Sequence, residues 1–297
     1  MEYGLVGILG TFFTYLCPAL GGLQAGSGKK GHFFLLSIAP SLLAMITQSS
    51  KLMFLIGMCL YLSGTVIAKI FANDFSAPRV RGGLKLVVGI ALIPTLVLVS
   101  FVSRLGVTDL NNLGDAIDPL IYSINSYTLG QVYAFADFFA FTIQHPSASV
   151  YKNDYYSFGA YTFASIFDML GMGKDFPPGM FEETAWYSNT FETNIFTVFR
   201  GLIYDFGVIG SLVFIFAFGL VSHFFAYRTL TEKNAWLACS AYMAIIVFIL
   251  MGYLISVFVA RYLFLNAAAI WVLLYVNEHV RTLSKYQPTL RGYMSKV

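Results

Sequence analysis

Long runs of apolar residues alternate along the chain with short polar connectors. A helix needs about 20 apolar residues to cross a lipid bilayer. We therefore predict seven membrane-spanning helices: Gly4–Leu23, Phe33–Ile46, Leu52–Ala72, Leu84–Ser103, Gly201–Tyr227, Trp236–Leu254 and Tyr262–Val276. Pro18, Pro40 and Pro94 lie inside these runs and are expected to kink the helices. The predicted fold class is all-α, a polytopic bundle forming one integral membrane domain over residues 1–297.

One connector, from Arg104 to Arg200, is far longer than the others and is expected to be folded. Between these arginines it holds ten of the fifteen acidic residues and only two basic ones, Lys152 and Lys174. Its stretch Pro119–Ile143 is apolar but carries several polar side chains, so we predict an amphipathic or re-entrant helix there. Gly207 and Gly210, near the start of the fifth predicted span, are interpreted as residues of close helix packing.

Lysine and arginine fix the predicted orientation. They cluster in the connectors after the first, third and fifth predicted spans and in the C-terminal tail. With seven spans these four regions fall on one side, which the positive-inside rule assigns to the cytoplasm. The prediction is a multi-pass protein with its N-terminus outside, its C-terminus inside and the 104–200 loop outside.

Composition supports a membrane protein and narrows the function. Of 297 residues, 58% are hydrophobic and 11% are charged, whereas a soluble domain carries about 25% charged residues. The net charge of +3 gives no indication of nucleic-acid binding. No phosphate-binding loop, dinucleotide motif or zinc-protease motif is present. We expect no metal site and no cofactor, and interpret the three cysteines as packing residues.

Three arginines mark the outer ends of predicted spans. Arg104 ends the fourth, Arg200 opens the fifth and Arg261 opens the seventh. They are either independent interfacial anchors or a shared site for an anion at headgroup depth. A guanidinium suits phosphate because its planar fork donates two parallel hydrogen bonds.

The loop also holds candidate general bases and many aromatic rings. The bases are Glu182, Glu183, Glu192 and His145, each of which is alternatively a solvated surface residue. The rings could stack on sugars, form the core of the loop, or belong to an interfacial belt. They include Tyr151, Tyr155, Tyr156, Tyr161, Trp186 and Tyr187.

The run Thr193–Gly210, which reads TNIFTVFRGLIYDFGVIG, resembles the segment that closes the large periplasmic loop in Wzy-type O-antigen polymerases. The turn Gln48–Lys51 and the long outer loop flanked by arginines are similar too. The resemblance implies a metal-independent glycosyltransferase of the bacterial inner membrane, which joins oligosaccharide repeat units carried on undecaprenyl pyrophosphate. It implies substrate binding by the three arginines and by Asn194, Tyr204 and Asp205, with Glu192, Glu183 or His145 as the base. Implied partners are membrane lipid, a flippase and a chain-length regulator, and no nucleic acid.

Two other functions fit much of the same pattern. A flippase or transporter for the lipid-linked oligosaccharide would place its polar groups near mid-membrane, often within internal repeats, and no repeat is visible. An O-antigen ligase, which moves a finished glycan to another acceptor, would share nearly all of these features. Only the resemblance separates a polymerase from a ligase.

Overall fold

A computed structural model describes residues 5–27, 34–47, 51–72, 74, 121–122, 125–145, 157–172, 181, 184–187, 191–232 and 234–294. The predicted span Leu84–Ser103, together with Arg104, Glu182 and Glu183, lies outside these residues. The described part of the chain is mostly helical, in agreement with the predicted class.

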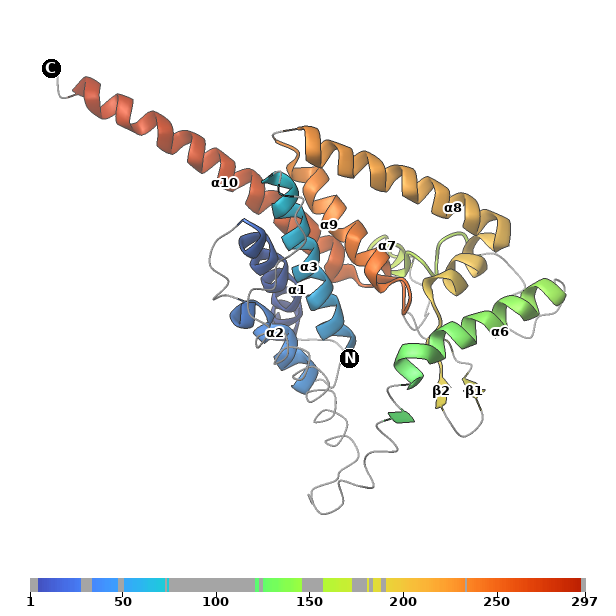
Figure 1. The fold of residues 1–297 in the computed structure, drawn as a ribbon. Helices are drawn as coiled ribbons and strands as arrows, with labels where there is room; N and C mark the ends of the chain where they lie inside the picture. The colour runs from blue at the N-terminus through green and yellow to red at the C-terminus, as the bar shows by residue number, and fades with distance from the viewer. Residues whose placement is uncertain are drawn as a thin grey trace, which may run out of the picture.

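The helices near the two ends of the chain form one bundle (Figure 1). The N-terminal helices are α1 (Leu5–Gly26), α2 (Phe34–Thr47) and α3 (Lys51–Phe71). The C-terminal helices are α8 (Val198–Thr231), α9 (Trp236–Met251) and α10 (Arg261–Met294), with a short 3-10 turn, η4 (Val257–Val259), before α10. The C-terminal half of α10 projects away from the bundle.

Within the described ranges, three helices are long and apolar enough to cross a membrane: Gly7–Gly26, Leu52–Phe71 and Val198–Thr231. The apolar helices α2 and α9 have only 14 and 16 residues, less than the roughly 20 that a bilayer needs. The predicted seventh span is the first part of a longer helix, since α10 continues from Val276 to Met294. The structure thus supports a membrane protein, and the count of seven spans stays a prediction.

Helices α1 and α3 approach one another closely because small residues line their contact. A Cβ added to Gly64 would lie 2.5 Å from the carbonyl oxygen of Ala19. Helix α2 is tied to α1 by Ser41, whose hydroxyl donates to the carbonyl oxygen of Thr14 over 2.7 Å. Small residues permit such backbone contact between helices in a membrane, where van der Waals packing drives association.

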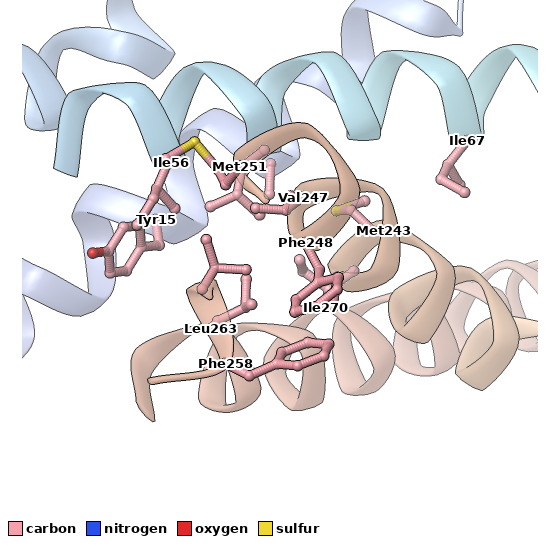
Figure 2. Close-up of a cluster of buried hydrophobic side chains, with 14 of the residues drawn as sticks. Tyr15, Ile56, Ile67, Met243, Val247, Phe248, Met251, Phe258, Leu263 and Ile270 are labelled. Atoms are coloured by element: carbon pink, nitrogen blue, oxygen red, sulfur yellow. The ribbon is translucent and has the colours of Figure 1, made fainter. Parts of the chain in front are cut away.

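The core of the bundle lies where α3, α9 and α10 meet. Figure 2 shows Ile56 of α3, Val247 and Met251 of α9, and Leu263 of α10 pointing toward one another. All four side chains are at most 2% exposed. This core holds the start of α10 against α9, and therefore fixes where Arg261 emerges from the bundle.

The described part of the 104–200 loop contains short helices and a hairpin. It holds a π-helical turn η3 (Ser126–Gly130) that continues into α6 (Gln131–Gln144), and a short helix α7 (Ala164–Met169). Strands β1 (Ala185–Tyr187) and β2 (Phe191–Thr193) pair antiparallel, with Trp186 opposite Glu192. The hairpin lies below the N-terminal part of α6 in Figure 1. A helix at Pro119–Ile143 was predicted, whereas strands of three residues carry too little alternation to be predicted.

Candidate functional site: a buried arginine at the break in α8

Helix α8 is broken at Gly207, whose backbone adopts φ 70° and ψ 177°. This conformation is essentially restricted to glycine. The backbone conformation thus requires glycine at position 207, a reason that the packing interpretation did not include. The break separates a first segment, Val198–Phe206, from residues 208–231, which are roughly 36 Å long at 1.5 Å per residue and so can cross the bilayer alone.

The break leaves carbonyl groups of the preceding turn in need of other donors. A turn formed by residues 157–162 of the loop supplies them. The N–H of Ser157 donates to the carbonyl oxygen of Tyr204 over 3.2 Å, and the N–H of Phe158 donates to that of Asp205 over 3.1 Å. The loop is thus joined to the helix through backbone groups at the point where the helix is interrupted.

Asp205 completes this attachment with its side chain, which is 0% exposed. Its Oδ1 accepts from the Ser157 hydroxyl over 2.5 Å and from the Tyr161 N–H over 2.9 Å. Its Oδ2 accepts from the Thr162 N–H over 2.7 Å. Hydrogen bonds to the ionised form are what make burial of a carboxylate tolerable. Asp205, predicted to bind substrate, is in this structure the residue that fixes the 157–162 turn.

Arg200 lies one turn earlier in α8, and its side chain is also 0% exposed. Its guanidinium carbon is 3.8 Å from the ring centre of Phe181 and 3.8 Å from that of Phe196. Phe138 and Tyr204 complete the surroundings at 5.1 and 5.3 Å. We call these four rings the aromatic cage. A desolvated cation over a ring face gains on the order of 2 kcal/mol, so the cage offsets part of the cost of burial.

The cage also orients the arginine. The Nη2 of Arg200 donates to the Tyr204 hydroxyl over 3.2 Å. The Tyr204 ring stacks on Tyr161 at a centre-to-centre distance of 5.2 Å, and Tyr161 belongs to the turn that Asp205 holds. Arg200 is therefore not a snorkelling anchor, because an anchor keeps its charged group in water. It is a buried charge held in one orientation.

The same turn connects this region to the start of α10. The Val198 N–H, at the start of α8, donates to the carbonyl oxygen of Gly252 over 2.9 Å. The Ser256 hydroxyl donates to the carbonyl oxygen of Thr162 over 3.0 Å. Arg261 follows a few residues later, exposed at the first position of α10 and with its guanidinium carbon 5.2 Å from the Tyr262 ring centre. The segments that carry Arg200 and Arg261 are thus linked through residues 157–162.

The predicted bases occupy different places. Glu192 is partly exposed on β2, where its carbonyl oxygen accepts a hydrogen bond from Ser126 at the start of η3. His145 is exposed at the C-terminal end of α6 and stacks on Phe141. The helical rise between Ser126 and His145 separates these ends by roughly 25–30 Å, so the structure does not bring Glu192 and His145 together. Asn194 is partly buried after β2, and its carbonyl oxygen accepts from the Phe181 N–H over 3.4 Å.

Sequence reasoning missed the residues that surround Arg200. Phe138, Phe181 and Phe196 lie on three segments, and nothing in an aromatic-rich loop distinguishes them from other rings. Among these three rings, only Phe196 could have been identified from the sequence, because it precedes Arg200 by four residues within the run that resembles the polymerases. The chain matches no family model, no curated protein and no solved structure.

Proposed function

We propose that the chain is a membrane glycosyltransferase that polymerises undecaprenyl-pyrophosphate-linked oligosaccharide repeat units into a surface polysaccharide of the O-antigen or capsule type. The observation that carries the proposal is the buried Arg200, which lies where the long loop enters a membrane helix. A guanidinium held rigidly at such a junction suits a lipid-linked anion, whose phosphates lie at headgroup depth while its glycan lies outside. The resemblance of Thr193–Gly210 to the polymerases supports the same assignment.

In the proposed reaction, a hydroxyl oxygen of the acceptor sugar attacks the anomeric carbon of the donor glycan. The bond from that carbon to the pyrophosphate oxygen breaks, and undecaprenyl pyrophosphate leaves with the electron pair. A carboxylate takes the hydroxyl proton, and Glu192 is our candidate because it is partly exposed on the outer hairpin. Glu183 and His145 remain alternatives.

Arg200 and Arg261 would stabilise the charge that develops on the leaving pyrophosphate, with Arg104 as a third contributor. Fixed positive groups contribute in this way without reorganising during the reaction. Arg261 is exposed and would meet the headgroup first, whereas Arg200 lies beneath Phe181. Binding donor and acceptor through their lipid tails at one membrane face would supply proximity. The protein would lie in the bacterial inner membrane with the loop outside.

Deleting the gene tests the proposal at the level of the product. We expect cells without the protein to carry a single repeat unit on the final acceptor, while lipid-linked units still reach the outer leaflet. Lipid-linked units trapped on the cytoplasmic leaflet would instead identify a flippase. Full-length polymer that accumulates on undecaprenyl pyrophosphate would identify a ligase. Either result would overturn the proposal.

A further inference from the structure

The β1–β2 hairpin presents an aromatic ring beside a carboxylate on one face. Trp186 and Glu192 are directly paired across the two strands. Side chains of residues that pair in this way lie on the same face of a sheet, with Cβ atoms about 5 Å apart. The Trp186 side chain is 70% exposed, although a tryptophan carries a large apolar surface. This face therefore combines an open apolar platform with an acceptor of hydrogen bonds.

The hairpin is held in place from its other face and from its backbone. On the opposite face, the Tyr187 hydroxyl donates to Asp137 of α6 over 2.7 Å, and its ring lies 5.7 Å from that of Tyr133. The Ser126 hydroxyl donates to the carbonyl oxygen of Glu192. Trp186 is thus exposed on an anchored element. Exposure on a fixed strand, without cover from the described residues, is the arrangement of a recognition surface.

Tyr122 lies near the carboxylate of Glu192. Partial burial raises the pKa of Tyr122 above its usual value, and the nearby charge of Glu192 raises it further. The phenol therefore keeps its proton at neutral pH and can donate as well as accept. The Trp186 ring and the Glu192 carboxylate match a sugar, which offers an apolar C–H face and an edge of hydroxyl groups.

We propose that Trp186 and Glu192 form a sugar-binding subsite that takes the acceptor end of the glycan. Trp186 stacks on the C–H face of the terminal sugar, and Glu192 hydrogen-bonds its hydroxyls. The identity of the ligand as a glycan rests on the proposed function. The placement also selects Glu192 over His145 as the base, because it brings a carboxylate to the acceptor hydroxyl. A tryptophan that only anchors the hairpin in lipid headgroups would gain nothing from a neighbouring carboxylate.

Fluorescence of Trp186 can test the subsite directly. The chain has three tryptophans, so replacing Trp236 and Trp271 by Phe leaves Trp186 as the only reporter. The full-length variant, in nanodiscs, would be titrated with oligosaccharide released by mild acid from the surface glycan of the same cells. We expect a saturable change in emission. Glu192→Gln should weaken binding about tenfold or more, the equivalent of losing one hydrogen bond to a charged group.

Two controls make the result decisive. Met172→Ala, at an exposed loop position that is 60% exposed, should leave the titration unchanged. Nanodiscs made with dibrominated phosphatidylcholine should leave Trp186 emission unquenched. Strong bromine quenching, or no response to the oligosaccharide, would make Trp186 a membrane anchor and overturn the subsite.

The subsite and the proposed function can fail separately. If Trp186→Ala binds the oligosaccharide like the parent, as measured by calorimetry, while deletion of the gene abolishes polymer, the subsite is wrong and the polymerase stands. If Trp186 reports saturable binding while deletion leaves polymer intact, the subsite stands and the polymerase is wrong. Trp186→Phe, which keeps a stacking ring, should retain most of the affinity that Trp186→Ala loses.

Discussion

At the residue scale, the charged Arg200 side chain is buried among aromatic rings that fit the shape of its guanidinium. The guanidinium is flat, and Phe181 and Phe196 lie against it at equal distances of 3.8 Å. A lysine in the same place would offer a compact, strongly hydrated ammonium, which loses more on burial and cannot present a flat face to two rings. The identity of the cation is therefore expected to matter as much as its charge.

We predict that Arg200→Lys lowers polymer output about tenfold or more at unchanged protein level in the membrane, almost as far as Arg200→Ala. Loss of one hydrogen bond to a charged group costs about 1.5–3 kcal/mol, which is roughly one to two decades in rate. The measurement is the length distribution of surface glycan. Arg228→Lys is the matched control, because the Arg228 side chain is 42% exposed and its ion pair with Glu232, over 2.7 Å, lies at the surface. Polymer of normal length in both Arg200→Lys and Arg200→Ala would show that Arg200 has a structural role only.

Asp205 is predicted to stabilise the fold through its three donors. Asp205→Asn replaces one carboxylate oxygen by an NH2 group that faces N–H or O–H donors, so we expect a loss of about 1.5–3 kcal/mol in the stability of the folded state. Thermal unfolding in detergent would measure it, together with faster proteolysis within residues 157–172. Asp168→Asn is the control, since Asp168 is exposed within the same 157–172 segment. Equal melting temperatures for the two variants would contradict this role.

The sequence indicated that Arg200 and Asp205 matter, but it did not give the contacts that hold them. Both lie in the run that resembles the polymerases, and both were assigned to substrate. Burial and partners come from residues that are distant in sequence: Asp205 binds residues 157–162, more than 40 positions earlier. Contacts of this kind leave no periodic trace in the chain, so only the folded structure reveals them.

At the scale of an element, the break at Gly207 divides α8 into a segment with buried charged residues and a longer apolar segment. The segment before Gly207 carries Arg200 and Asp205, whereas the segment after it is largely exposed and apolar, with Ile209 79% exposed. Periodicity predicted the run and its spanning length, because both halves are hydrophobic. It did not predict the break, since an isolated glycine within a helical pattern is also compatible with packing.

We predict opposite effects for two glycine substitutions in α8. Gly207→Ala should destabilise the protein by about 1–3 kcal/mol, because an L side chain is strained at the φ of 70° found there. Gly219→Ala should be neutral or stabilising by up to about 1 kcal/mol, since an added Cβ meets nothing within 4 Å. Thermal unfolding of both variants would be compared with that of the parent. A Gly207→Ala variant as stable as Gly219→Ala would show that α8 can be continuous.

At the scale of the whole molecule, the central prediction is the orientation in the membrane. The charge pattern places the loop outside and the connection between α8 and α9 inside. Single cysteines at Met172 and Asn234, both exposed, would be introduced after replacement of Cys17, Cys59 and Cys239. In intact cells, a membrane-impermeant thiol reagent should label position 172 and leave position 234 unlabelled until the membrane is opened. Labelling of position 234 alone would reverse the topology and contradict the proposed function.

The aromatic cage has a consequence for how the chain can change over evolutionary time. Its rings come from α6, from the loop at Phe181, from Phe196 just before α8 and from Tyr204 within α8, so no single segment contains the whole environment of Arg200. Loss of one ring leaves a buried charge less compensated, and loss of the arginine leaves a space among the rings. We therefore expect substitutions at positions 138, 181, 196, 200 and 204 to co-vary among descendants of this gene, while exposed neighbours such as Phe199 drift independently.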